Sequence, residues 1–126
     1  MLIEIDFQSD EALYMQLRNQ IVLGIASSMI QEGDPLPSVR QLAGDIGINM
    51  HTVNKAYAVL REKGFVTIDR RRGAIIALNG DRQRAEQELR TRLCVMLAKG
   101  ICKNIPRSDV HAMVDDIYEE LLSEKE

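Results

Sequence analysis

The stretch Ser38-Val39-Arg40-Gln41-Leu42-Ala43-Gly44-Asp45-Ile46-Gly47-Ile48-Asn49 decides the fold of this chain. Ser38 and Gln41 have the spacing of a capping box, in which the serine accepts from the third helical amide and the glutamine reaches back. Gly47 can adopt the left-handed conformation that ends a helix. The stretch therefore predicts a short helix over 39–46.

A second helix follows after one further residue. Asn49 is a favourable N-cap, and Gly64 closes the helix that it opens, over 50–63. Two helices joined by a short turn that contains a glycine are typical of a helix-turn-helix. The apolar positions of the second helix recur at helical spacing: Val53, Ala56, Tyr57 and Leu60.

Another helix is predicted upstream of this pair. Ser9 or Asp10 offers an N-cap, and the helix runs to about Gln31 before Gly33 ends it. Asp34-Pro35-Leu36-Pro37 predicts a stiff extended connector, because a residue before proline avoids the helical conformation. Ile3 and Ile5 alternate with acidic residues and predict a short edge strand. Two rows of apolar residues mark the helix: Leu13, Leu17, Ile21 and Ile25, then Tyr14, Val22 and Met29.

Downstream, two β-prone segments over 65–68 and 74–78 flank the loop Asp69-Arg70-Arg71-Arg72-Gly73. Gly73 supplies the positive φ that such a hairpin needs. Three helices followed by a hairpin are the order of a winged helix-turn-helix, with the hairpin as its wing. We therefore expect residues 1–78 to form one winged helix-turn-helix domain.

The remaining residues, 79–126, predict two amphipathic helices, one over about 82–103 and one that begins at the Ser108 cap. Two such helices cannot bury both apolar stripes against each other and remain stable alone, so we expect a second copy of the chain to cover them. The fold class is mainly α with a small β-hairpin, and this tail is a two-helix dimerisation domain. The expected interface residues are Leu89, Leu93, Met96, Leu97, Val114, Ile117 and Leu121.

Charge is distributed unevenly along the chain. The net charge is −3, yet residues 38–73 carry +4 while residues 1–37 carry −5 and residues 81–126 carry −2. Salt screens charges beyond about 8–10 Å, so a polyanion would meet the local field of the basic middle third. The overall acidity therefore does not exclude DNA as a partner.

The string from Gly33 to Ala43 resembles the DNA-binding domain of the GntR family of bacterial regulators. The likeness continues through three short strings and three single positions: Gly47-Ile48-Asn49, Thr52-Val53, Lys55-Ala56-Tyr57, Leu60, Gly64 and Gly73. The two-helix tail is similar to that of the YtrA-like subfamily. The resemblance implies a homodimer that represses nearby genes from a palindromic operator, in this subfamily often transporter operons. It also allows for an unidentified small-molecule effector. Two cysteines in a chain with no export signal favour a cytoplasmic location.

The expected recognition helix begins at Met50, with its N-terminal end in the major groove. By resemblance, Arg40 and Thr52 match family residues that approach the operator, and an arginine fork suits guanine O6 and N7. Asn54 has the chemistry to read adenine. His51 and Met50 occupy positions that set an individual operator preference. The remaining expected contacts at this end are Asn49 and Lys55.

The wing carries the densest positive charge of the chain, Arg70-Arg71-Arg72. A charge run is usually a solvated tip, but a wing lies beside the minor groove, and a narrow groove attracts arginine. We expect at least one of these arginines to touch DNA, with Gly73 shaping the tip.

Other chemistry finds little support in the sequence. Cys94 and Cys102 lie eight residues apart on one predicted helix, about 12 Å by helical rise, too far for a disulfide; they are expected to be small packing residues. His51 and His111 give no metal-binding spacing. We expect no enzymatic activity, no cofactor, no metal, no secretion signal and no membrane span.

Two rival interpretations remain open. The winged helix could serve as a protein-interaction module that has lost DNA binding, which the overall acidity favours and the arginine tip opposes. The chain could also sense a ligand in a pocket at its dimer interface, although no cluster of residues specifies one.

Overall fold

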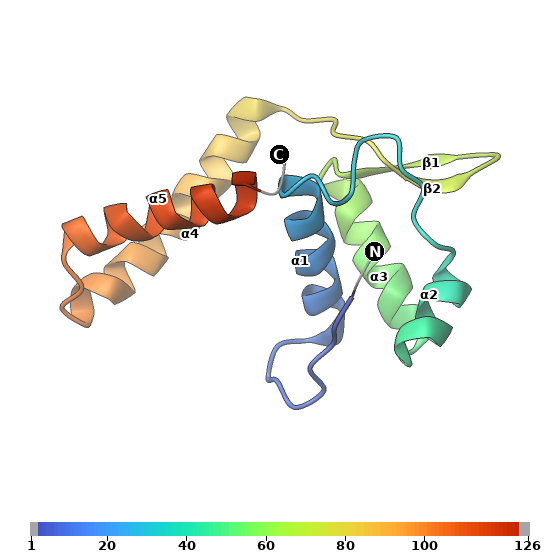
Figure 1. The fold of residues 1–126 in the computed structure, drawn as a ribbon, viewed down its shortest axis with the longest axis horizontal. Coiled ribbons are helices and arrows are strands. Elements are labelled where there is room, and N and C mark those ends of the chain that lie inside the picture. Colours follow the sequence, from blue (N-terminus) through green and yellow to red (C-terminus); the bar gives the residue numbers. More distant parts are fainter. Residues whose placement is uncertain (1–2, 124–126) are drawn as a thin grey trace.

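The computed structural model describes residues 3–123 and contains, within them, five helices and one two-stranded antiparallel hairpin. Figure 1 shows the helices α1, α2 and α3 gathered with the hairpin, while the helices α4 and α5 extend away from them. The bounds are α1 Leu13–Ala26, α2 Val39–Ile46, α3 Met50–Glu62, β1 Val66–Asp69, β2 Gly73–Ile76, α4 Arg82–Cys102 and α5 Arg107–Ser123. This order confirms the predicted mainly helical winged helix-turn-helix with a two-helix tail.

The helix-turn-helix forms as its capping residues predict. The Ser38 hydroxyl accepts from the Gln41 amide at 3.1 Å, and Gly47 ends α2 with φ 73°. Asn49 Oδ1 accepts from the His51 amide at 2.6 Å and so opens α3. The capping box is only half formed, because no bond from the Gln41 side chain to the Ser38 amide occurs among the described residues.

The predicted bounds of α1 were wrong at both ends. Its N-cap is Ala12, whose side chain makes no capping bond, because Ser9 accepts instead from the Glu11 amide in the turn that precedes the helix. The helix ends early because Ser28 adopts the left-handed conformation with φ 63°. The helix therefore stops at Ala26, and Met29 lies beyond it, exposed.

The edge strand predicted over residues 3–5 is also wrong. Instead of pairing with a sheet, this segment lies along α1 and bonds to two glutamine side chains. Gln20 exchanges hydrogen bonds with the Glu4 amide and carbonyl. Gln16, which is buried, accepts from the Asp6 amide at 2.9 Å and donates to its carbonyl at 3.0 Å. Side-chain amides thus satisfy a backbone that the sequence pattern assigned to a strand.

One apolar core holds α1, α2, α3 and the hairpin together. The helix α3 packs against α1, α2 and β1. Each large side chain buried here contributes roughly 1.5–3 kcal/mol relative to an exposed one. The Tyr57 hydroxyl donates to the Pro37 carbonyl at 2.8 Å, and burial raises the pKa of this phenol so that it remains a donor. Fully buried members of the core are Leu17, Ile21, Val53, Ala56, Leu60 and Ile76.

The connector before α2 pairs with the wing, which the sequence did not predict. The amide of Leu36 donates to the Ala74 carbonyl at 2.8 Å, and the Ile76 amide donates to the Asp34 carbonyl at 2.9 Å. An isolated bridge joins Pro35 and Ile75 beside these bonds. The connector therefore covers one edge of β2, while β1 covers the other.

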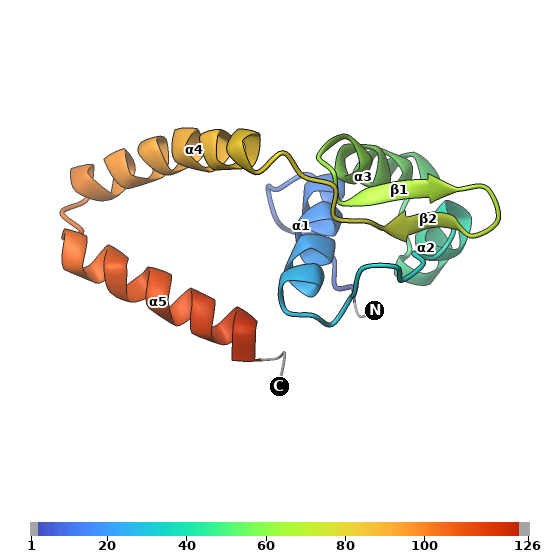
Figure 2. The ribbon, with the colours of Figure 1, turned by 90° about the horizontal axis from the view of Figure 1, so that it is seen from above.

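The tail follows β2 and leaves the core at a corner where residues 77 and 79 bond to residues 65 and 64, just beyond the end of α3. It forms the open arrangement of Figure 2. Asp81 caps α4 by accepting from the Arg84 amide at 3.2 Å, and Asn104 ends it with φ 62°. The helix α5 follows Pro106, begins one residue before the expected Ser108 cap and touches α1. No helix within residues 3–123 has the length and hydropathy needed to cross a membrane.

Gly64 is the glycine on which this corner depends. Its φ of 84° favours glycine, and a Cβ there would lie 2.1 Å from the Asn79 carbonyl oxygen. We expect Gly64→Ala to lower the free energy of unfolding by about 1–3 kcal/mol, as strained backbone positions do. The measurement is the midpoint of urea unfolding.

Gly44→Ala is the matched control. Gly44 lies within α2, and a Cβ there would meet no atom within 4 Å. Because alanine favours a helix over glycine, this variant should gain about 0.5–1 kcal/mol. Equal effects of the two substitutions would contradict the assignment of Gly64.

Candidate DNA-binding surface

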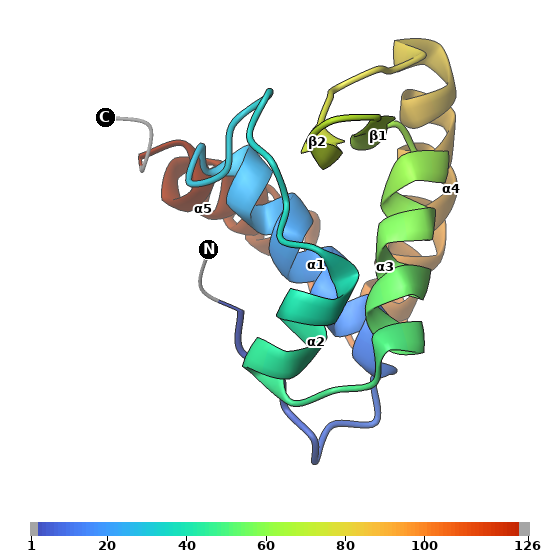
Figure 3. The same ribbon diagram turned by 90° about the vertical axis from the view of Figure 1, so that its right-hand side faces the viewer.

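One side of the molecule presents α2, the N-terminal end of α3 and the wing together, and Figure 3 faces this side. The helices α4 and α5 extend to the opposite side in Figure 1. The predicted recognition residues are therefore brought to one surface, separate from the tail. We call this the α2–α3–wing surface.

The first turn of α3 exposes most of the residues that were expected there. Met50, His51 and Asn54 are exposed, and Thr52 is half-buried. Asn49 is exposed too, but its Oδ1 is committed to the His51 amide, so its first role is to cap the helix. The positive end of the helix dipole at such an N-terminus favours a phosphate.

Lys55, unlike the other residues expected to contact DNA on α3, makes a cation–π contact with another helix of the protein. Its ammonium group sits 4.1 Å from the centre of the Tyr14 ring on α1, which is the geometry of a cation–π contact. The side chain therefore stabilises the packing of α3 on α1. Its expected DNA contact stays a prediction, and such a contact would need the ammonium to leave the ring.

Arg40 is exposed on the first turn of α2. No ion pair within the described chain involves this guanidinium, so its charge is not neutralised by a protein carboxylate there. An unpaired arginine on an open surface is available for a bidentate contact with a guanine edge or a phosphate.

A hollow separates α3 from the wing. It is lined by the start of α2, by one face of α3 and by the end of the hairpin next to its loop, including Asn54, Tyr57, Arg61, Ile68 and Gly73. Arg61 was not among the predicted site residues. Its signal was available, because Arg61 lies seven residues after Asn54 and so shares its face of the helix.

Asp69 shapes the tip of the wing, a role that was not predicted from the sequence. Its carboxylate accepts from the amides of Arg71 and Arg72 at 2.8 and 3.1 Å and also lies 3.6 Å from the Arg72 guanidinium. The two backbone bonds, more than the charge of Arg72, hold the pKa of this carboxyl below its usual range. The carboxyl is therefore ionised at neutral pH, where both bonds are strongest, and protonation in acid weakens them.

The wing arginines are not equivalent in this arrangement. Arg72 is held by Asp69, whereas Arg70 and Arg71 are exposed and form no ion pair within residues 3–123. Gly73 has φ 76°, as the hairpin prediction required. Two free cations thus project from a tip whose backbone is fixed.

The cysteines correct another prediction. Cys94 and Cys102 are both free thiols, but they are exposed on α4 rather than packed within the subunit.

Residues 10–76, more than half of the chain, match the family model of bacterial regulatory proteins of the gntR family. This chain belongs to the gntR family. It is a DNA-binding transcriptional regulator of the helix-turn-helix type. The α2–α3–wing surface contains the part of the chain that the family model covers.

Individual relatives agree with this membership. The transcriptional repressor YtrA of Bacillus subtilis is 38% identical over 78 residues, which are 62% of this chain and 60% of that protein. The structure of YtrA from Sulfolobus acidocaldarius, a GntR-family transcription factor, is 35% identical and covers 75% of this chain and 99% of that one, with a TM-score of 0.61. The expected similarity to YtrA is thereby confirmed.

A further solved structure extends the likeness of the fold to the tail. A transcriptional antiterminator from Listeria monocytogenes is 24% identical, with a TM-score of 0.87 over 97% of this chain and 93% of that one. At this identity the likeness concerns the fold alone. The open arrangement of α4 and α5 nevertheless occurs in a solved structure.

The effect of Asp69 on DNA binding is expected to be opposite to the one that its charge alone would predict. Asp69→Ala removes a negative charge beside three arginines, yet we expect it to weaken DNA binding, because the wing turn loses both of its backbone bonds. Hydrogen exchange at the amides of Arg71 and Arg72 should accelerate in the same variant.

Asp69→Asn is the control for that experiment. The asparagine side-chain oxygen can still accept from both amides, so exchange should stay near that of the parent while DNA affinity rises. The role assigned to Asp69 is wrong if the alanine and asparagine variants exchange at the same rate.

Proposed function

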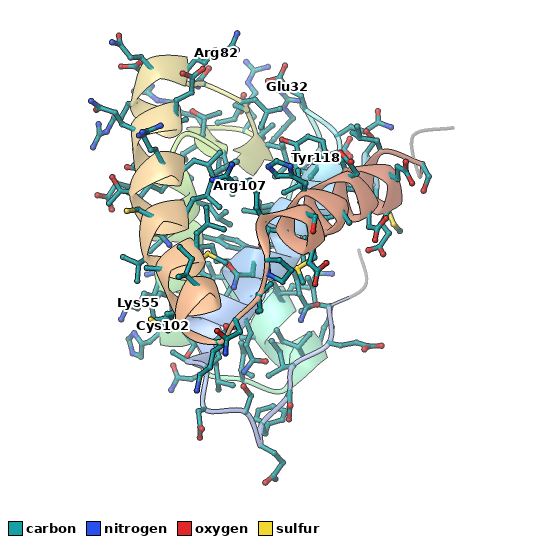
Figure 4. All side chains as sticks on the ribbon, turned by 90° about the vertical axis from the view of Figure 1, so that its left-hand side faces the viewer. Glu32, Lys55, Arg82, Cys102, Arg107 and Tyr118 are labelled. Carbon is teal, nitrogen blue, oxygen red and sulfur yellow. The ribbon has the colours of Figure 1, made fainter. Side chains whose placement is uncertain are left out.

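We propose that this regulator binds a palindromic operator as a homodimer and represses the genes beside it. The observation that carries the proposal is the uncovered apolar surface of the tail: α4 and α5 contain no buried residue. Figure 4 views the molecule from this side, with Arg82 at the start of α4, Cys102 at its end and Tyr118 on α5. This apolar surface lies on the side of the molecule away from the α2–α3–wing surface.

The expected interface residues supply most of this surface. Leu89, Leu93, Met96, Leu97, Val114 and Ile117 are 38–65% exposed, and Leu121 is half-buried. Monomeric proteins rarely expose apolar patches larger than a few hundred Å² without a binding role. A second copy of the tail, related by a twofold axis, would cover both stripes in the same contact.

A twofold dimer also accounts for the palindrome. It presents two recognition helices to half-sites about one helical turn apart, roughly 34–36 Å. In each half-site the N-terminal end of α3 enters the major groove, with Arg40 beside it on α2. Arg70 and Arg71 extend to the neighbouring minor groove or its phosphates. Repression is the activity named for the YtrA relative, and a dimer seated on an operator can block transcription sterically.

Sequence-specific binding should depend on Arg40. We expect Arg40→Ala to lose about 1–3 kcal/mol of operator affinity if the arginine reads a base. The measurement is a gel shift with the DNA upstream of the gene, repeated at several salt concentrations. Replacing Arg70 and Arg71 with alanine should instead flatten the salt dependence, by about 0.9 for each phosphate that the variant no longer neutralises.

Arg82→Ala is the control for both variants, because Arg82 pairs with Glu86 on α4, away from the α2–α3–wing surface. An Arg40 variant that binds as well as the parent would remove this residue from the interface. Failure of the parent to bind any DNA, beside tight capture of a protein, would favour the rival protein-interaction module.

The dimer has a separate test. Leu93→Glu places a charge in the centre of the uncovered stripe of α4, so sedimentation should show a monomer and operator affinity should fall sharply. Phe7→Glu changes another exposed apolar side chain, in the turn before α1, and should leave the dimer intact. A Leu93→Glu variant that sediments as a dimer would place the interface elsewhere.

A further inference from the structure

The segment between β2 and α4 is bonded to the end of α3 and to Glu32 rather than being a free linker. Successive amides of residues 77, 78 and 79 all find acceptors: the Ala77 amide donates to the Phe65 carbonyl at 3.0 Å, the Leu78 amide to Glu32 Oε2 at 2.7 Å, and the Asn79 amide to the Gly64 carbonyl at 2.9 Å. Gly64 leaves no space for a side chain against Asn79. These bonds hold residues 77–79 against the end of α3, and α4 begins three residues later.

An ion pair closes the corner from the outside. Lys63 is the C-cap of α3, and its ammonium donates to Glu88 Oε1 on the second turn of α4 at 3.1 Å. Glu88 also lies 3.9 Å from the Arg84 guanidinium. One carboxylate therefore joins the end of the recognition helix to the helix of the proposed dimer interface.

Glu88 is surrounded by positive charge. The hydrogen bond from Lys63 and the charges of Lys63, Arg84 and Arg92 lower the pKa of its carboxyl. Without this carboxylate, Lys63 would face two arginines across the corner. Like charges repel, so the change would do more than remove one attraction: it would favour opening of the angle between α3 and α4.

Because α4 is long, a small change in the angle between α3 and α4 moves the far end of α4 by a large distance. Its 21 residues span about 32 Å at the helical rise of 1.5 Å per residue. A rotation of about 6° at the corner therefore moves the far end by about 3.4 Å, which is the rise of one base pair. Because the proposed interface lies along α4, the same rotation changes the separation of the two recognition helices.

From these contacts we propose that Glu88, held by Lys63 and Arg84, is a specificity-determining residue that restricts the dimer to one spacing between operator half-sites. Glu88 acts by positioning α3 and touches no DNA itself. The inference rests on the proposed dimer and goes beyond it, since a flexible linker would also permit a dimer but would accept several spacings.

The test uses the full chain and duplex DNA. A palindrome selected from random DNA by the parent is rebuilt with spacers one base pair shorter and longer, and affinities are measured by fluorescence anisotropy. We expect the parent to prefer its best spacing by at least tenfold. Glu88→Gln should reduce this preference several-fold while the variant still sediments as a dimer and keeps its affinity for a single half-site.

Two further variants separate positioning from general damage. Glu86→Gln removes a carboxylate of the same helix that pairs only with Arg82 among the described residues, so it should keep the parent's spacing preference. Lys63→Met should broaden the preference as Glu88→Gln does. The double variant should be no broader than the worse single one, because both substitutions remove one shared interaction.

The outcomes distinguish this inference from the proposed function. A Glu88→Gln variant with the parent's spacing preference would overturn the role of Glu88 and leave the palindrome-binding dimer standing. A parent that is monomeric, or that binds one half-site as tightly as the palindrome, would overturn the proposed function and this inference with it.

Discussion

The burial of one apolar stripe of α3 determines which side chains of that helix face outward. Val53, Ala56 and Leu60 are fully buried, and Tyr57 is tied by its hydroxyl to the Pro37 carbonyl. Because residues three and four apart share a helix face, burying this stripe turns the opposite face outward, where Asn54 and Arg61 line the hollow beside the wing. The orientation of the recognition helix is thus a consequence of core packing.

The two ends of α3 differ in how many contacts they make with the rest of the protein. Its N-terminal end is capped by the exposed Asn49, and the side chains of Met50, His51 and Asn54 are exposed there. Its C-terminal end is enclosed by Gly64, Asn79 and the Lys63–Glu88 pair. In the proposed complex, a recognition helix that is open at one end and anchored at the other would carry the geometry of the tail to the DNA.

Local signals explain which parts of the fold could be predicted from the sequence. Ser38, Gly47 and Asn49 act within a turn or two of their own positions, so the helix-turn-helix could be located correctly. The start of α1 could not, because Ser9 bonds to Glu11 in a turn that competes with capping. The strand expected at Ile3 and Ile5 failed for a related reason: Gln16 and Gln20, far along the chain, satisfy that backbone.

The candidate site shows the same division between local and distant signals. The exposure of Arg40 and His51 follows from helix periodicity, which a sequence reveals. The position of Lys55 over Tyr14 depends on how α1 crosses α3, and the approach of Lys63 to Glu88 depends on a corner between two helices. Contacts of this kind join residues on different helices, and the helical periodicity of a sequence does not predict which of these residues meet.

The tail illustrates how a helix can persist without a core. Asp81 caps the start of α4, Asn104 closes its end, and the pairs Arg82–Glu86 and Arg84–Glu88 follow the i,i+4 spacing. Each such pair is worth only a few tenths of a kcal/mol and a cap about 1 kcal/mol, so together they hold a helix but cannot cover its apolar side chains. In the proposed dimer the interface is therefore already formed before association, which lowers the ordering cost of binding and leaves apolar burial as the main source of affinity.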